Sequence, residues 1–508
     1  MTTTFALAFE RVQQKSQAAG ELLRLCAYLA PEAIPLDLLS QETVDLGPVL
    51  TPVVAQPFAL DAALEILQAY SLVRRDAEQG TLSLHRLVQA VQQETAPEDE
   101  QRLWAERALR LVSAAFPTPE VADWEICQHL LPHALVCIEQ IARWNFSFPE
   151  AASLLHRAGH YLHERAAYEQ ARPLLHQALS MREHLLGATH PDVAQTLETL
   201  AVLSWAQGQY EQALPFAERA LLLSEQALGP LHPDVAAKLN TLGMIHCDLG
   251  NYAQARPLLR RALAIREQAL GPVHPDVAQS LNNLAILYYQ QGKYPEALPL
   301  YQRALAIWEQ VLGPDHPDVA TSLNNLANLY RNQGQYQQAL PLLQRSLDIR
   351  EQALGPAHPD VAWSLNGLAN LHRAQGHHTE ALLLLQRSLT ILERSAGPAH
   401  PEVAWTLNSL ADVYHAQARS IEALPLAERA LAIREQAFGS HHPDVAESLN
   451  ALARLYEVQG EHAQALSFYR RALAILEAGA ADHPTTIATR ERVAALLQQM
   501  ERAETASG

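Results

Sequence analysis

Apolar positions between residues 275 and 312 follow the spacing of two consecutive helices. Leu281, Leu284, Ala285 and Tyr288 recur at intervals of three, four and seven residues, which places them on one face of a helix. Gly292 then supplies a turn, because a residue without a side chain readily takes a positive φ. The apolar face of the second helix consists of Tyr294, Ala297, Tyr301, Ala304 and Leu305. A Gly-Pro pair at 313–314 ends this helix, so the segment predicts a helix–turn–helix unit.

The same unit recurs along most of the chain with a period of 42 residues. Its marker is the pentamer His-Pro-Asp/Glu-Val-Ala, which begins at His190, His232, His274, His316, His358, His400 and His442, and in a degenerate form at His483. Proline suits the first turn of a helix, where its missing N–H is not needed, and the acidic residue favours the positive helix end. We count eight repeats, which start near Ala152, Ala194, Ala236, Ala278, Ala320, Ala362, Ala404 and Ala446. The seventh repeat carries Ala418 and Ser420 in place of Gly and Tyr at the turn.

The segments on either side of the repeats predict different structures. Residues 8–30, 31–40 and 61–70 predict helices, 41–57 a Pro-rich loop, and 71–76 with 81–85 a β-hairpin. This is the element order of a winged helix, so we expect a winged-helix-like α+β domain at 1–97 and a helical connector at 98–150. The repeats then occupy 151–482. Because a stack of repeats leaves one apolar end open, we expect a capping helix at 483–503, followed by a disordered tail at 504–508.

The repeat resembles the tetratricopeptide repeat, in the 42-residue form of kinesin light chains. The matching signature positions are Leu281, Leu284, Ala285, Tyr288, Ala297, Tyr301 and Ala304, and the LGPxHPDVA linker matches the kinesin light chain type. The resemblance covers residues of about 152 to 480 and implies an all-α fold, a right-handed superhelix. It further implies that the first helix of each repeat lines a concave face, and that positions two, five, six, nine, twelve and thirteen face a partner.

The N-terminal segment resembles the region after the nucleotide-binding module in STAND-type (NB-ARC) signalling ATPases of bacteria. The stretches ELLRLCAYLAPEAIPLDLL, LVRRD and LSLHRLVQAV carry this similarity. In that family a histidine of a Met-His-Asp-like motif contacts the ADP phosphate, and His85 stands at the matching position. Arg86 replaces the usual Asp, however, and no GxxxxGK[ST] loop occurs to cradle phosphates. His85 is therefore either an ordinary packing residue or a relic of nucleotide sensing, and an ATPase module was either lost or lies on another chain.

Composition narrows the kinds of partner. The 508 residues carry a formal net charge of −18, which disfavours nucleic acid and anionic membrane surfaces. The hairpin of the winged-helix-like domain does not change this, since Arg74 and Arg75 are followed by Asp76 and Glu78. The four cysteines, Cys26, Cys127, Cys137 and Cys247, have no CxxC spacing and predict free thiols. With no apolar run long enough to span a bilayer and no signal-like N-terminus, we expect a cytoplasmic protein.

Asparagine recurs at position five of six repeats, at Asn240, Asn282, Asn324, Asn366, Asn408 and Asn450. Asparagine is a poor helix former, so this recurrence requires a reason. One interpretation is that the amides bind the backbone of an extended peptide, because each amide both donates and accepts. The other is a ladder of hydrogen bonds between neighbouring helices. We favour the peptide interpretation here.

Further positions on the expected concave face add to this candidate site. Amides occur at Asn283, Asn325, Asn328 and Asn370. Arg331 and Arg373 stand at position twelve of adjacent repeats and suit a ligand carboxylate. Trp363 and Trp405, at position two, serve either as apolar anchors for a partner or as packing between repeats. We therefore predict a peptide site in repeats four to six that prefers an acidic or aromatic segment.

Histidines and catalytic motifs give weaker signals. His156, His160 and His163 share one helix face, which fits a metal-binding or pH-sensitive patch less well than a solvated polar face. The motifs GxSxG, HExxH, CxxC and the phosphate-binding loop are all missing, so we expect no enzyme, cofactor or metal. Three functions stay open: a peptide- or protein-binding scaffold, the sensor half of a STAND-type machine, and a hydrolase or metal enzyme. We favour the scaffold.

Overall fold

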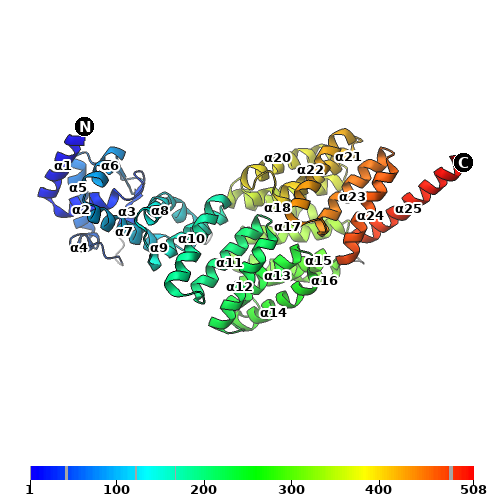
Figure 1. Cartoon of the computed structure of the whole chain (residues 1–508), viewed down its shortest axis with the longest axis horizontal. Helices are drawn as coiled ribbons and strands as arrows, with labels where there is room; N and C mark the ends of the chain where they lie inside the picture. Colours follow the sequence, from blue (N-terminus) through cyan, green and yellow to red (C-terminus); the bar gives the residue numbers. More distant parts are fainter. Residues whose placement is uncertain (1, 40–43, 120–122, 166, 480–483, 508) are drawn as a thin grey trace. The chain divides into compact units, whose positions relative to one another are not determined.

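The computed structural model describes residues 2–39, 44–119, 123–165, 167–479 and 484–507, and divides into two parts. The first part is Met1–Thr196 and the second is Leu197–Gly508. Over the described residues the chain is almost entirely helical, and helices follow one another in pairs through most of its length (Figure 1). The structure thus confirms the predicted α-solenoid with a small N-terminal region that contains strands.

The N-terminal region combines short helices with a three-stranded antiparallel sheet in the order β1-β3-β2. Its elements are α1 (Thr2–Lys15), α2 (Gln17–Cys26), β1 (Ile34–Pro35), α3 (Leu36–Leu39), α4 (Leu50–Val54), α5 (Pro57–Ala69), β2 (Val73–Asp76), β3 (Thr81–Leu84) and α6 (Arg86–Thr95). The predicted hairpin is confirmed, with Arg75 opposite Leu82. A buried apolar cluster that includes Leu22, Leu64 and Leu82 joins the sheet to the helices.

Three local predictions in this region were wrong. The helix expected at 8–30 is broken at Ser16, whose hydroxyl caps α2 by accepting from Ala19 N–H at 3.2 Å. In the segment 31–40, expected to be helical, Ile34–Pro35 form β1, which pairs with β3, and helix is found at Leu36–Leu39 of the described residues. The loop expected at 41–57 contains α4, while residues 40–43 lie outside the described residues. In the first two cases a capping or strand-pairing contact overrides the local apolar pattern.

Two long helices, α7 (Glu98–Ala115) and α8 (Trp124–Trp144), lead from this region to the repeats. The paired helices are α9 (Pro149–Glu164), α10 (Tyr168–Leu186), α11 (Pro191–Ala206), α12 (Tyr210–Leu228), α13 (Pro233–Asp248), α14 (Tyr252–Leu270), α15 (Pro275–Gln290), α16 (Tyr294–Leu312), α17 (Pro317–Asn332), α18 (Tyr336–Leu354), α19 (Pro359–Ala374), α20 (His378–Ser395), α21 (Pro401–Ala416), α22 (Ser420–Phe438), α23 (Pro443–Val458) and α24 (His462–Gly479). A last helix, α25 (Pro484–Ser507), packs on α24 and extends past the expected end at 503.

Each His-Pro-Asp/Glu motif starts a first helix, as the sequence predicts. Proline occupies the first turn, and the histidine before it is the N-cap residue. In all seven copies His Nδ1 accepts from the backbone N–H two residues later, at 3.1–3.2 Å. This bond satisfies one of the free N–H groups at the helix end. The motif is therefore a helix start in every repeat, and its Nε2 atom stays available for another contact.

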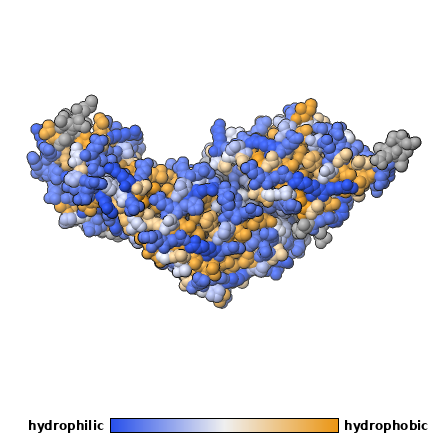
Figure 2. Space-filling model, in the orientation of Figure 1, coloured by the Kyte–Doolittle hydropathy of each residue, from blue (hydrophilic) through white to orange (hydrophobic). Residues whose placement is uncertain are grey.

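The turn between the two helices of a repeat needs a residue with positive φ. Gly334 supplies it in the fifth repeat, with φ +75°. In the seventh repeat Ala418 takes the same conformation, with φ +60°, so the turn is kept despite the loss of glycine. Small residues allow close packing of the two helices of a repeat: Ala285 and Ala297 are fully buried and lie in one apolar cluster. On the face drawn in Figure 2, polar and apolar side chains alternate over the surface of the helices.

Candidate functional site

The six asparagines at position five lie inside the array. Their exposed fractions are only 2–6%. Four of them donate from Nδ2 to a hydroxyl oxygen of the next repeat or of α25: Asn240 to Ser280 at 2.7 Å, Asn366 to Thr406 at 2.9 Å, Asn408 to Ser448 at 2.7 Å and Asn450 to Thr489 at 2.9 Å. These bonds form the ladder between neighbouring helices. The peptide role of these six residues stays a prediction, and it requires their donors to serve both purposes.

The amides at positions six and nine are more accessible than the ladder. Asn283, Asn325 and Asn328 are half-buried, whereas Asn370 is only 4% exposed. Asn325 donates to Asn282 Oδ1 at 3.1 Å, which ties the fifth repeat to the fourth. Asn328, one helical turn further along α17, forms no side-chain hydrogen bond within the described part of the chain. Its amide is therefore available to a partner on this face.

The two arginines at position twelve differ in their surroundings. Arg373 is half-buried and faces Asp412 of the next repeat, with Nη1 3.8 Å from the carboxylate. Arg454 shares this carboxylate at 2.6 Å, so Asp412 lies between two cations. Arg331 lies against Tyr289, where burial raises the pKa of the tyrosine hydroxyl and Arg331 lowers it. Within the described ranges Arg331 has no ion-pair partner. A half-buried guanidinium without a carboxylate attracts an acidic ligand.

The two tryptophans at position two are not equivalent. Trp363 is 46% exposed, and its indole N–H donates to the carboxylate of Glu402 at the start of α21. Burial raises the pKa of Glu402 to about 7, and the indole donor partly offsets this rise. Trp405 is half-buried. Trp363 thus links two repeats through its edge while it leaves much of its ring open, so both roles considered for it are compatible with its position.

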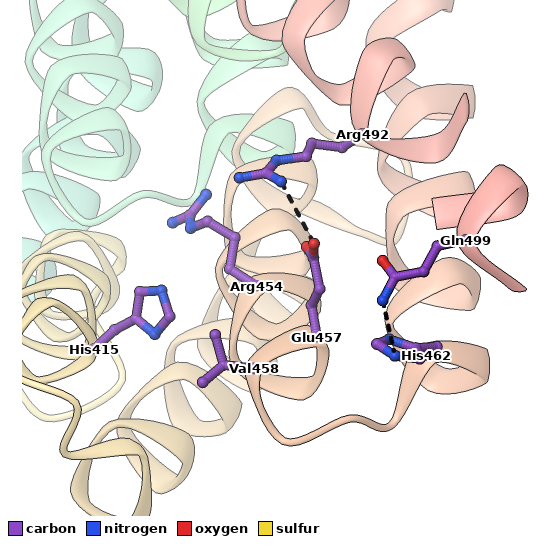
Figure 3. Close-up of a pocket in the computed structure, with 7 residues that line it drawn as sticks. All are labelled: His415, Arg454, Glu457, Val458, His462, Arg492 and Gln499. Carbon is purple, nitrogen blue, oxygen red and sulfur yellow. Dashed lines mark hydrogen bonds and ion pairs between the residues drawn. The ribbon is translucent and has the colours of Figure 1, made fainter. Parts of the chain in front are cut away.

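A pocket of about 240 Å³ lies at the C-terminal end of the array, where α25 meets the last repeats (Figure 3). It is lined by His415, Arg454, Glu457, Val458, His462, Arg492 and Gln499. Arg492 pairs with Glu457 at 3.4 Å, and Gln499 lies 3.4 Å from His462 Nε2. Because Arg454 also pairs with Asp412, the charges of this pocket largely cancel. The sequence did not single out this pocket.

The histidines of the first repeat do not form a single solvated face. His156 is 3% exposed, and burial lowers its pKa well below the usual value. His160 and His163 are half-buried and lie within 4 Å of Glu164. The expectation of a solvated stripe was therefore wrong for His156. Over the residues that the structure describes, no group of three or more His, Cys, Asp or Glu side chains is arranged to hold a metal ion.

His85 is exposed and caps α6, because its Nδ1 accepts from Leu87 N–H at 3.2 Å. It lines an open pocket of about 510 Å³ together with Arg74, Arg75 and Ser83. Arg75 is held by Asp61 at 2.7 Å. His85 is therefore a surface residue of the N-terminal region and does not belong to its core.

Buried arginines escaped the sequence interpretation. Arg182, Arg266, Arg350 and Arg434 occur at intervals of 84 residues on second helices and are 1–5% exposed. Each donates from Nη1 to the backbone carbonyl of the Asp in the following His-Pro-Asp motif, at 2.7–2.9 Å. Arg266 illustrates a further contact, to Ser280 Oγ at 3.0 Å. The sequence signal that could have identified them is an arginine at every second repeat, at a position that is otherwise Ser, Trp or Leu.

The family model for the tetratricopeptide repeat matches seven overlapping segments that together run from residue 150 to 478. These segments cover more than half of the chain, so the protein belongs to the tetratricopeptide repeat family. Its repeats are of the kinesin light chain-like 42-residue kind. A second model, for a domain of unknown function, matches residues 8–101. The described residues contain no helix that is both long and apolar enough to cross a membrane.

The chain is similar to parts of several known proteins and solved structures. A nucleotide-binding leucine-rich repeat-like protein of Hyaloscypha variabilis is 34% identical over 198 residues, which are 37% of this chain and 18% of that protein. The chain thus spans less than a fifth of this curated relative. A putative kinesin light chain of Podospora anserina with nearly identical repeats is 31% identical over 40% of this chain and 96% of its own, with a TM-score of 0.33. A Rap protein in complex with competence and sporulation factor has a TM-score of 0.51 at 15% identity, and the match covers 74% of this chain and 97% of that one.

Proposed function

We propose that the repeat array is a non-catalytic scaffold that binds an extended peptide or protein segment along the first helices of repeats four to six. Stacked repeats of this family offer a long concave surface, and such surfaces serve to bind partners. The accessible groups here are the amides of Asn283, Asn325 and Asn328 and the guanidinium groups of Arg331 and Arg373. Amides suit the donors and acceptors of an extended backbone, and arginines suit carboxylates.

Arg331 is the observation that carries this proposal. The chain has an excess of acidic residues, 55 against 37 basic ones, yet no described carboxylate pairs with this half-buried cation. Asn328 lies three residues earlier on the same helix face and adds a free amide. A partner that places a Glu or Asp against Arg331 and a backbone amide against Asn328 satisfies both. Trp363, 46% exposed one repeat further on, provides an apolar surface for an aromatic side chain.

Peptide display against the purified full chain tests this proposal. We expect the selected sequences to be enriched in Glu and Asp, and their binding to fall at least tenfold in Arg331→Gln. The matched control is Arg303→Gln, because Arg303 is also solvent-accessible but is held by Glu267 at 2.7 Å on the second-helix side of the array. Selection of neutral or basic peptides, or equal loss in both variants, contradicts the proposal.

A second function is favoured by the N-terminal region. The NLR-like relative is much longer than this chain, and the pocket beside Arg74 contains His85, the position that resembles the ADP-sensing histidine of STAND ATPases. In this alternative the array is the sensor of a signalling ATPase whose nucleotide-binding module is supplied in trans. The test is to co-express the chain with a candidate module encoded beside it and to measure ADP retention. An effect of His85→Ala on ADP release supports the alternative, and unchanged release contradicts it.

A further inference from the structure

The second part of the chain makes contact with itself over a long sequence interval. His400 Nε2 lies 2.7 Å from the carbonyl oxygen of Ala206, and His442 Nε2 is bonded to the carbonyl oxygen of Asp248. Both pairs are separated by 194 residues, so the two contacts are related by one repeat. We call this contact the seam. On one side it comprises the ends of α11 and α13 with the turns that follow them, and on the other side the starts of α21 and α23.

Packing at the seam is tight. A Cβ atom at Gly208 would lie 2.3 Å from Pro401 Cγ, and one at Gly250 would lie 3.1 Å from Pro443 Cγ. The equivalent turn glycines Gly334, Gly376 and Gly460 have open space at that position. The ring of Tyr210 stacks on Phe438, with centroids 5.2 Å apart and an interplanar angle of 6°. The same turn motif is thus buried at the seam and free elsewhere.

The histidine exposures show the same distinction. His400 is 8% exposed as a whole residue, and the side chain of His442 is 6% exposed, against 42% for His232, 39% for His274 and 11% for His358. All five rings cap their helices through Nδ1. At the seam, His400 and His442 also place Nε2 against a distant backbone carbonyl. The helix-starting motif therefore provides a second bond where one superhelical turn meets the next.

The seam determines access to the concave face. Turns such as the one at Gly208 form one edge of the ribbon of repeats, and the starts of first helices form the other edge. Because the seam joins one edge to the other, closing it restricts the route by which a partner reaches the first helices between the two contacts. We expect an extended segment to pass this restriction, whereas a folded domain requires the edges to separate.

The contacts and charges of the seam also allow its two sides to separate. Neighbouring repeats pack along the full length of their helices, but the seam touches only helix ends and turns. It gathers the carboxyl groups of Asp248, Glu402 and Asp444 around Tyr210; burial and these charges together raise the pKa of the Tyr210 hydroxyl. Like charges held close together oppose closure. Closure thus depends on a few contacts that act against electrostatic repulsion.

We propose that the seam is a reversible latch, which closes the superhelix of the second part and admits a partner to its concave face when it opens. Closure of the latch does not depend on the proposed function. The admission of a partner rests on the proposed function. The latch excludes folded domains in its closed state and selects an extended peptide as the partner. This gives the His-Pro-Asp/Glu motifs at His400 and His442 a second role beside helix capping.

A disulfide tests closure directly. A Cβ at residue 208 lies 3.5 Å from Pro401 Cβ, within the roughly 3.5–4.5 Å that disulfides span. In the full-length variant Gly208→Cys, Pro401→Cys, mild oxidation should therefore join the two residues, as read by peptide mapping without reductant. The control is Gly334→Cys, Pro401→Cys, which has a similar positive φ, +75° against +69°, but open space around the new Cβ. The four native cysteines are buried. Absence of the 208–401 disulfide, or equal yield in the control, overturns the latch.

The same variant tests admission. The probes are a fluorescein-labelled Glu/Trp peptide and the same peptide fused to a folded domain at each end. We expect the oxidised chain to bind the fused probe at least tenfold more weakly than the reduced chain. Equal binding by both forms overturns the role of the latch in admission while closure stands. If neither form binds either probe, the proposed function fails, and the disulfide yield still decides whether the seam closes.

Discussion

His400 bonds two segments of backbone at once: its Nδ1 accepts from Glu402 N–H at 3.2 Å, and its Nε2 lies 2.7 Å from the carbonyl oxygen of Ala206. The first bond is local and is repeated at every His-Pro-Asp/Glu motif. The second joins residues 194 positions apart. Burial lowers the pKa of His400, and the bond to Ala206 partly offsets this effect, so the ring is neutral at pH 7 with its proton on Nε2.

Replacing His400 with Asn separates these two contacts. Asparagine is a strong N-cap residue, so the local bond is kept while the donor to Ala206 is lost. A lost hydrogen bond of this kind costs about 1 kcal/mol, so we expect amide exchange in the turn 206–210 to speed up about fivefold. The control is His316→Asn, since His316 caps α17 in the same way with its side chain 25% exposed. Equal exchange in the two variants contradicts a distinct role for His400.

The buried arginines predict a stability difference between two arginines on the same helix. Arg350 donates to Asp360 O at 2.9 Å, Ser364 Oγ at 3.0 Å and Thr321 Oγ1 at 3.0 Å. We expect Arg350→Leu to lower the free energy of unfolding by about 2–3 kcal/mol, because buried acceptors lose a charged donor. Arg345→Leu removes an exposed pair with Glu309 and should cost at most about 1 kcal/mol. Denaturant titration measures the free energy of unfolding of both variants. A smaller loss for Arg350→Leu than for Arg345→Leu contradicts a structural role for the buried arginines.

Asparagines at positions five and nine should separate stability from binding. Asn408 donates to Ser448 Oγ at 2.7 Å inside the array, so Asn408→Ala should destabilise it by about 1–3 kcal/mol. Asn328 is half-buried on the accessible face, and Asn328→Ala should change stability by no more than about 0.5 kcal/mol. Only the second variant should weaken peptide binding while its thermal unfolding is unchanged. If Asn408→Ala weakens binding without loss of stability, the peptide role of position five is restored.

Asp248 predicts a pH dependence at the seam. Burial raises its pKa to about 6, and donors from Trp205 and Gln290 partly offset this rise. Because the folded-state pKa is raised, the protonated Asp248 side chain stabilises the fold fully below about pH 4, the pKa range of the carboxyl group in the unfolded chain. This stabilisation is lost as the pH rises through 6. Asp248→Asn should therefore stabilise the chain at pH 8 by about 1–3 kcal/mol, and by nothing at pH 4. The amide keeps the bond from Trp205, which is 2.6 Å long.

Gln290 makes this substitution well suited to the test. Its Nε2 lies 3.4 Å from Asp248 Oδ1, while its Oε1 is buried and without a partner in the described structure. A flipped Gln290 amide can therefore accept from the N–H group that the substitution introduces at position 248. The control is Asp444→Asn, across the seam, which removes a neighbouring charge but not the buried group. Thermal unfolding from pH 4 to 8 measures both, and a wild-type profile for Asp248→Asn contradicts the assignment.

The repeat was predictable from the sequence because its signals are local and occur many times. Proline after histidine, glycine at the turn and apolar spacing each predict one helix start, turn or face, and the structure places them accordingly. The N-terminal region was less predictable, since the break at Ser16 and the strand at Ile34 depend on single capping and pairing contacts. The pattern of apolar and polar residues along the chain does not predict such contacts.

Side-chain roles on the concave face were harder to predict than the fold. A recurring asparagine indicates that an amide is required at that position. Both a bound partner and a hydroxyl group in the next repeat would require it, so the sequence does not distinguish them. Only the position of Ser280, 40 residues from Asn240, shows that the donor is used internally. The seam could not be predicted from the sequence, because residues 206 and 400 become neighbours only through the accumulated rotation of the repeats between them.

The most direct test of the account is to ask which face of the array a bound partner touches. A photo-crosslinking amino acid at position 328 lies on the accessible side of the first helices, and one at position 303 lies on the second-helix side. Both full-length variants are illuminated with the display-selected acidic peptide, and adducts are mapped by mass spectrometry. The account predicts adducts from position 328 and none from 303. Adducts from 303 alone would place binding outside the concave face and contradict it.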